Sequence, residues 1–280
     1  MRELCDRRIL AALRCRDGVT QLPVRSSMQI AARGVSILRN RSGYYVIVSA
    51  PGFERYTQTF DLAELGVAPA PATLTLQITD PSGQYLPRRF TVPLPRPAAV
   101  GDPAPAPGSP SVFQPIDIPL YPSPLARTSP GWAVLRTTVL NATTGRRLPW
   151  ALIRTTLATA ADTPFLGLSD WRGEALVAVR GIPITTWADP NDDDLDPDPA
   201  TPPPVTTTAV TATLEVIADP TRQTIAPDAD LLTMTDPNPN FFPDPEDLNA
   251  RRATLPSGTQ TLTLASGQTY TTALSVTLNS

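Results

Sequence analysis

The sequence predicts an all-β protein made of two tandem antiparallel β-sandwich domains that are joined and decorated by long proline-rich loops. Three observations carry this prediction. Apolar and polar residues alternate with the period of a strand in most segments that can form a core. The chain contains 34 prolines, far above the usual share of about 5%, and proline stops helices. One sequence motif of strand, tight turn and strand, the repeated phrase, occurs three times.

The repeated phrase is built around an Asp or Asn, a glycine and a Leu-Pro pair. Asp and Asn cap such a turn with their own side chains, and glycine supplies positive φ, so each copy is predicted to be a β-hairpin. The clearest copy, VLRTTVLNATTGRRLPWALIRTT, runs from Val134 to Thr156. The other two copies carry Asp17, Gly18, Leu22 and Pro23, and Asp80, Gly83, Leu86 and Pro87.

The first domain is predicted to span residues 1–124, with a proline-rich loop at 95–111. Residues 1–8 are charged and are expected to form a short arm, and a helix over residues 3–14 is the competing interpretation of the first strand. The boundary is placed at Tyr121-Pro122-Ser123-Pro124. The expected strands are 9–16, 22–32, 35–39, 44–49, 56–62, 73–79, 88–94 and 112–120, the last at a sheet edge because it contains proline.

The second domain is predicted to span residues 125–280. After the third copy of the phrase, Ser169-Asp170-Trp171-Arg172-Gly173 forms a turn that leads into a strand at 174–179. Further strands are expected at 210–218, 259–264 and 270–278. Two acidic, proline-rich stretches, 188–205 and 219–250, are expected to be loops inserted between these strands.

Two lines of sequence resemble a known family. The line from Gly43 through Tyr45, Ala50, Gly52 and Phe53, and the turn with Asp170 and Gly173, are similar to lines of carboxypeptidase-regulatory-like and Cna-B-like domains. This resemblance implies a transthyretin-like seven-strand sandwich. It concerns the accessory sandwich, so it implies no peptidase activity: the zinc ligands of the catalytic domain include His, and this chain has none.

Composition argues against several classes of function. The net charge is −3 with no concentrated basic face, which argues against nucleic acid as a partner. The use of arginine without lysine is ascribed to high genomic G+C content rather than to a binding surface. The absence of His removes the usual general base and the commonest metal ligand, so we expect neither an enzyme nor a cofactor. Cys5 and Cys15 are expected to be incidental free thiols.

No stretch approaches the roughly 20 apolar residues that a membrane span requires. The N-terminus also lacks the features of a secretory signal. We therefore expect synthesis and assembly in the cytoplasm, with release as part of a particle as a further option.

The acidic stretch after residue 188 is the one candidate metal site. Asp189, Asn191 and Asp193 have the spacing that begins a calcium loop, because calcium takes several closely spaced oxygen ligands. The glycine turn and distal Glu of such a loop are missing, so a solvated acidic loop is favoured over a calcium site. Asp17 and Asp170 are interpreted as turn caps rather than as catalytic acids.

The aromatic residues divide into core and surface candidates. Tyr45, Phe53 and Trp150 lie at inward positions of predicted strands and turns, so they are expected in the core. Four others lie in turns or polar loops, where we expect anchors of a subunit contact. These interface candidates are Trp171, Trp187, Phe241 and Phe242.

These inferences favour a non-catalytic structural protein that forms homo- or hetero-oligomers with other protein subunits. The line IDIPLYPSPLARTSPGW, followed by a carboxypeptidase-regulatory-like module, resembles small proteins of phage-tail-like contractile injection particles. That resemblance implies a particle subunit held by loop and sheet-edge contacts. The alternative is a carbohydrate-binding or adhesive β-sandwich module, for which Trp171 and Trp187 are the suggestive residues.

Overall fold

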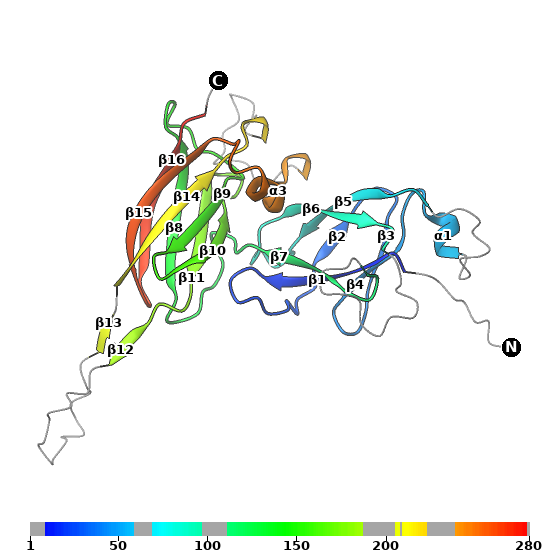
Figure 1. The fold of residues 1–280 in the computed structure, drawn as a ribbon, viewed down its shortest axis with the longest axis horizontal. Helices are drawn as coiled ribbons and strands as arrows, with labels where there is room; N and C mark the ends of the chain where they lie inside the picture. Colours follow the sequence, from blue (N-terminus) through cyan, green and yellow to red (C-terminus); the bar gives the residue numbers. More distant parts are fainter. Residues whose placement is uncertain are drawn as a thin grey trace, which may run out of the picture. The chain divides into compact units, whose positions relative to one another are not determined.

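A computed structural model describes residues 9–58, 69–96, 111–186, 205–207, 209–222 and 239–278, and these are arranged mainly as β-strands (Figure 1). The all-β prediction is confirmed. The chain divides into two compact units, each with its own core: unit 1 contains Met1–Tyr121 and Pro237–Glu246, and unit 2 contains Pro122–Asp236 and Asp247–Ser280. In the described part of the chain, no helix has the length and apolar character needed to cross a membrane.

Unit 1 is a sandwich of a four-stranded and a three-stranded sheet. Side chains from both sheets, such as Leu13 and Ile47 on one and Leu76 and Phe90 on the other, form one buried core, as alternating strands require. The first sheet has the order β3 (Ser36–Arg39), β4 (Tyr45–Ser49), β1 (Ala11–Asp17), β7 (Ile116–Leu120). The second has the order β2 (Gln29–Ala31), β5 (Ala72–Thr79), β6 (Arg88–Leu94).

Unit 2 is a second sandwich, with a core formed by residues such as Leu135 and Val177 from one sheet and Ile153 and Val216 from the other. A separate two-stranded ribbon, β12 (Ile184–Thr186) with β13 (Val205–Thr207), extends from its sheets (Figure 1). One sheet has the order β10 (Ala160–Leu168), β9 (Leu152–Leu157), β14 (Ala209–Ile217), β15 (Ser257–Ala265). The other has the order β11 (Glu174–Val179), β8 (Ala133–Asn141), β16 (Thr269–Val276).

The two units share one topology. In each, a central strand (β1 or β8) has an antiparallel neighbour (β4 or β11) and a parallel neighbour (β7 or β16), so each sandwich contains one parallel pair among antiparallel ones. The opposite sheet contains an antiparallel trio, β2-β5-β6 or β9-β14-β15. The strand before β4 or β11 pairs differently in the two units. In unit 1, β3 pairs with β4, whereas its counterpart in unit 2, β10, pairs with β9 in the opposite sheet.

The prediction that all three copies of the phrase are hairpins is wrong for two of them. Only the copy around Asp80 joins strands of one sheet, because β5 and β6 pair directly. In the other two, β1 and β2 lie in different sheets, as do β8 and β9. A short stretch pairs first, with bridges Arg16–Pro23 and Leu140–Arg147, and the chain then crosses to the opposite sheet. In unit 1 the pairing extends past Pro23, because the Val24 N–H still donates to the Cys15 carbonyl, and in unit 2 it extends to the Leu148 N–H, just before Pro149.

The predicted strand at 56–62 is also corrected. Residues Glu54–Gln58 form a short helix, α1, and residues 59–62 lie outside the described part of the chain. Gly52, at a φ of 81°, makes the turn before it, and its N–H donates to the Glu54 carboxylate. The rings of Phe53 and Tyr56 meet edge to face and are buried, which fits the i, i+3 spacing of a helix.

A buried arginine ties a distant segment of sequence to unit 1. Arg88, at the start of β6, is only 1% exposed, and its Nη1 donates to Glu246 Oε1 and to the Pro119 carbonyl, both at 2.8 Å. Its guanidinium lies 5.6 Å from the Tyr121 ring centroid. The next residue along β6, Arg89, donates its N–H to the Pro243 carbonyl. Residues 237–246, expected within a loop of the second domain, are therefore part of unit 1.

The remaining short helices flank this segment. They are η1 (Pro220–Arg222), η2 (Pro239–Phe241) and α3 (Pro245–Ala250). Leu248 on α3 packs with Leu152 and Ile217 in a small cluster of unit 2, so the chain passes from one unit to the other within this helix.

The arginine anchor can be tested by neutralising its partner. Glu246→Gln keeps the shape but leaves the buried Arg88 guanidinium with less compensating charge, so the free energy of unfolding of unit 1 should fall by about 1–3 kcal/mol. Urea unfolding followed by far-UV circular dichroism measures the change. Glu54→Gln, at an exposed position of α1, is the matched control; the amide oxygen can still accept from the Gly52 N–H, so stability should change by less than about 0.5 kcal/mol. Equal effects of the two substitutions would contradict the anchor.

Two glycines close the sandwich of unit 2 at its two sides. A Cβ on Gly167 of β10 would lie 2.5 Å from Val177 Cγ2 of β11, and a Cβ on Gly258 of β15 would lie 2.0 Å from the Ser275 carbonyl oxygen of β16. The backbones of opposite sheets approach too closely there for any side chain. Each sheet edge of unit 2 is thereby brought against the other sheet.

Gly258→Ala should therefore destabilise unit 2 by about 1–3 kcal/mol, because backbone atoms must move to admit the methyl group. All four tryptophans of the chain lie between residues 132 and 187, so tryptophan fluorescence during urea unfolding reports on unit 2. Thr259→Ala, at an exposed position of the same strand, is the control and should cost less than about 1 kcal/mol. A Gly258→Ala protein as stable as this control would rule out the close contact.

Candidate functional site

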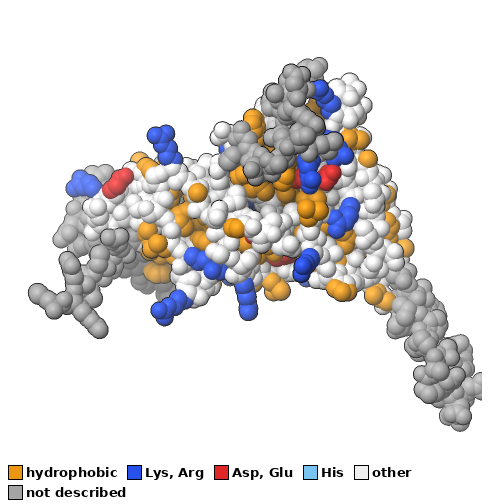
Figure 2. All heavy atoms as spheres, turned by 180° about the vertical axis from the view of Figure 1, so that it is seen from behind, with side chains coloured by type: hydrophobic (Ala, Val, Ile, Leu, Met, Phe, Trp, Pro, Cys, Tyr) orange, Lys and Arg blue, Asp and Glu red, His pale blue; other side chains and the backbone are white. Residues whose placement is uncertain are grey.

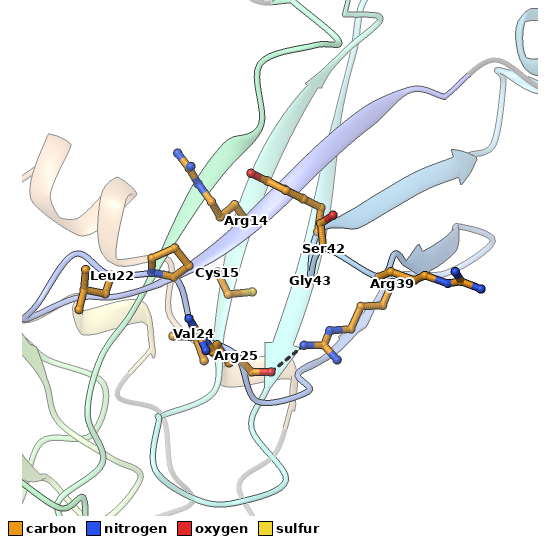
Figure 3. A pocket seen from close by; sticks show the side chains of 11 residues that line it. Arg14, Cys15, Leu22, Val24, Arg25, Arg39, Ser42 and Gly43 are labelled. Carbon is orange, nitrogen blue, oxygen red and sulfur yellow. Dashed lines mark hydrogen bonds between the residues drawn. The ribbon is translucent and has the colours of Figure 1, made fainter.

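The candidate site is a pocket of about 630 Å³ on unit 1 (Figure 3). It lies beside β1, between the segment that crosses from β1 to β2 and the turn that joins β3 to β4. Its lining consists of Arg14, Cys15, Leu22, Pro23, Val24, Arg25, Arg39, Arg41, Ser42, Gly43 and Tyr44.

Backbone pairing explains why the pocket exists. The first half of β1 pairs with β4, in the register Ala11–Ile47 to Leu13–Tyr45. On the opposite edge, β1 pairs with β7 from Leu13 to Asp17. On the same edge as β4, the second half of β1 bonds to the crossing segment: the Val24 N–H donates to the Cys15 carbonyl and the Asp17 N–H to the Leu22 carbonyl, each at 2.9 Å. Arg14 and Cys15 lie at the junction of these pairings and both line the pocket, with Arg14 partly exposed and Cys15 buried on the core side of β1.

The charge of the lining is strongly positive. Four arginines line the pocket and no Asp or Glu does. Arg14 is held by Asp117 of β7, with Nη2 to Oδ2 at 2.9 Å, and this hydrogen bond raises the pKa of Arg14. Arg39 donates to the Arg25 carbonyl at 2.7 Å and lies over the Tyr45 ring. Within the described residues, no carboxylate forms an ion pair with Arg25, Arg39 or Arg41.

One wall of the pocket is apolar. Leu22, Pro23 and Val24 come from the crossing segment, and Leu22 is 64% exposed. Tyr44 and Ser42 come from the β3–β4 turn and add hydroxyl groups. The pocket thus combines forked cationic donors, which suit carboxylates and phosphates, with an exposed apolar surface.

The floor of the pocket contains a buried thiol. Cys15 is free and 3% exposed, and burial raises its pKa to about 12. The thiolate is the reactive form of cysteine, so Cys15 is inert at neutral pH despite the arginines around it. The pocket consequently has donors for an anion but lacks an activated nucleophile.

At the corresponding junction of unit 2, the two segments approach each other closely. There, β8 pairs with β11 and with the segment after its own turn, through Leu148 N–H and the Val139 carbonyl at 2.8 Å. The turn before β11 fits closely against that segment: a Cβ on Gly173 would lie 3.0 Å from Arg147 Cβ and 3.1 Å from Leu148 N. The same topology therefore leaves a pocket in unit 1 and a packed contact in unit 2.

The aspartates considered as acids are turn caps. Asp17 Oδ1 accepts from the N–H groups of Val19 and Thr20, and Oδ2 accepts from the Tyr85 hydroxyl at 2.8 Å. Asp170 is fully buried, and its Oδ1 accepts from the N–H groups of Arg172 and Glu174. Burial raises the pKa of Asp170, although these hydrogen bonds oppose the shift.

The predicted interface aromatics differ in how far they are buried. Trp171 is half-buried, with its ring 6.5 Å from that of Trp150 and the Arg172 guanidinium 5.3 Å from its centroid. Phe241 is half-buried and Phe242 is 3% exposed, so Phe242 does not present the free ring that an anchor needs. Trp187 lies outside the described residues, and a subunit contact through this set stays a prediction.

The calcium candidates Asp189, Asn191 and Asp193 also lie outside the described residues. In the part of the chain that is described, no group of three or more His, Cys, Asp or Glu side chains could hold a metal ion.

Sequence reasoning missed the arginine pocket. It found no concentrated basic face, because Arg14, Arg25, Arg39 and Arg41 are spread along the sequence and come together only when two turns meet beside β1. Their common location in the first 41 residues was the available signal. On the face of the molecule drawn in Figure 2, arginine side chains stand out at several places, while acidic side chains are few among the coloured residues.

Comparisons with known proteins add little to this site. No protein-family model matches the chain, and no curated protein sequence matches it. Crystal structures of two mutants of the shaft pilin SpaA from Lactobacillus rhamnosus GG are similar, each at a TM-score of 0.23. The first is 9% identical and covers 74% of this chain and 63% of its own, which is less than two thirds. The second is 11% identical, with 86% and 80% covered. Likeness at this level assigns neither a family nor a function.

The buried thiol gives a direct test of the pocket floor. In a Cys5→Ser protein, which leaves Cys15 as the single thiol, native Cys15 should react with iodoacetamide at pH 8 at least about 100-fold more slowly than in urea. Because its pKa is raised in the folded state to about 12, the thiol favours folding below the unfolded value. That contribution should be lost as pH rises from about 9 towards 12. Equal labelling rates in native and unfolded protein would show that Cys15 is accessible.

Proposed function

We propose that this chain is a non-catalytic structural subunit, and that the arginine pocket of unit 1 docks an acidic segment of a protein partner. The observation that carries the proposal is the open, carboxylate-free lining of four arginines beside an apolar wall. Arginine forks bind carboxylates with two parallel hydrogen bonds, which gives orientation as well as attraction. A side-chain carboxylate of an extended peptide therefore matches the pocket.

The chemistry of the other groups agrees with a docking role. The chain has no His, Cys15 is held protonated, and Asp17 and Asp170 are occupied as caps of the turns that hold the sheets. Two sandwiches with a shared topology provide a rigid scaffold on which loops are displayed. The particle to which such a subunit would belong is, on the sequence resemblance alone, a phage-tail-like contractile injection particle.

A carbohydrate-binding module is less well supported. Glycan recognition needs an exposed, flat aromatic ring, and Trp171 is instead half-buried between Trp150 and the Arg172 guanidinium. The arginine pocket offers cationic forks rather than an open aromatic platform.

The docking role can be tested with a hexa-aspartate peptide labelled with a fluorophore. We expect salt-sensitive binding by fluorescence anisotropy, because attraction between exposed charges is screened within about 3 Å at 1 M salt. A matching hexa-asparagine peptide should not bind. Arg25→Ser combined with Arg41→Ser should weaken binding about tenfold, since each exposed ion pair contributes up to about 1 kcal/mol.

Arg33→Ser is the matched control, because Arg33 is exposed on the same unit and does not line the pocket. It should leave the affinity within about twofold of the unmodified protein. If Arg33→Ser weakens binding as much as the double variant does, the peptide responds to overall charge and the pocket has no docking role.

A further inference from the structure

The ribbon of unit 2 holds a segment whose chemistry complements the pocket. β12 and β13 pair from Ile184–Thr207 to Thr186–Val205, so residues 187–204 leave and return at one pair of neighbouring positions. The ribbon extends from the sheets of unit 2 (Figure 1), and this segment follows its far end. The described residues that flank it, Thr186 and Val205, are paired at the end of the ribbon.

The sequence of this segment is WADPNDDDLDPDPATPPP. It carries six aspartates and no basic residue, and six prolines alternate with or follow the acids. Proline-rich chains favour an extended conformation, so less entropy is lost when they bind in a groove. Aspartates along such a chain would meet the arginines, while Leu195 and the prolines would meet the apolar wall.

We propose that the arginine pocket of one copy binds the aspartate- and proline-rich segment 187–204 of a second copy. This inference rests on the docking role proposed above and names the partner. The pocket is on unit 1 and the segment is on unit 2, so every chain carries one arginine pocket and one acidic segment. A contact between two different surfaces of identical chains is heterologous, and it leads to rings or open filaments rather than to a symmetric dimer.

Opposite charge selects this occupant over other parts of the chain. The whole chain has 26 acidic residues against 23 arginines. Several described acids are engaged in caps or ion pairs, such as Asp17 and Asp170 in turns and Asp117 in β7. Segment 187–204 concentrates acidic charge without a neighbouring arginine in sequence, whereas Arg25 and Arg41 provide positive charge without an ion pair among the described residues.

The test compares two complementary variants of the full chain by sedimentation velocity at 25 mM and 500 mM NaCl. The pocket variant carries Arg25→Ser and Arg41→Ser. The segment variant carries Asp→Asn at all six acidic positions of 187–204. These are Asp189, Asp192, Asp193, Asp194, Asp196 and Asp198.

The unmodified protein should associate with increasing concentration at low salt and dissociate at high salt. Each variant alone should associate about tenfold more weakly, because each lacks one half of the contact. An equimolar mixture should form one-to-one dimers, since the pocket variant supplies an intact segment and the segment variant an intact pocket. Arg33→Ser should associate like the unmodified protein, and thermal unfolding monitors whether each variant is folded.

Four outcomes would overturn the inference. The pocket variant associating like the unmodified protein would place the contact elsewhere. A mixture of the two variants that stays monomeric would show that the two halves do not meet between copies. A free 187–204 peptide that binds the segment variant but not the unmodified, monomeric protein would show that each chain fills its own pocket. Hexa-aspartate binding without self-association would leave the docking role standing and remove only this partner.

Discussion

Both units depend on one backbone constraint, which prevents the central strand from pairing at length with the strand that follows it. After β1 and β8 the chain makes a turn capped by Asp17 or Asn141 and bonds back for only a few residues. Gln21 or Trp150 adopts a positive φ of about 60° in this returning stretch, next to a Leu-Pro pair. The chain then enters the opposite sheet, where β2 and β9 add to its core-facing strands.

This crossing decides where a pocket can form. Because β1 uses its first half for β4 and part of its second half for the crossing segment, two turns meet beside Arg14 and Cys15. In unit 2 the equivalent turn contains Gly173 and fits against Arg147 and Leu148. In unit 1, Arg39 and Arg41 line the space between the turn and the crossing segment, and Arg39 bonds across it to the Arg25 carbonyl. One topology therefore gives a close contact between the two segments in unit 2 and a pocket between them in unit 1.

Local sequence predicts the strands and turns but not their assignment to sheets. Alternation identified β5, β6, β8 and β11 closely, and the side-chain caps at Asp17, Asp80 and Asp170 follow from turn chemistry. A strand-turn-strand phrase looks the same whether it folds as a hairpin, as at Asp80, or crosses between sheets, because the choice depends on packing that is distant in sequence. The same holds for Arg14 with Asp117 and for Arg88 with Glu246, whose partners lie far along the chain.

Acidic and basic side chains are distributed unevenly along the chain. In unit 1, the acids near the pocket are committed to structure: Asp17 caps a turn and receives the Tyr85 hydroxyl, and Asp117 holds Arg14. The pocket arginines Arg25, Arg39 and Arg41 have no ion pair among the described residues. In the sequence, six aspartates follow the ribbon of unit 2. Separation of opposite charge onto two rigid sandwiches favours contacts between chains that are specific in geometry and sensitive to salt.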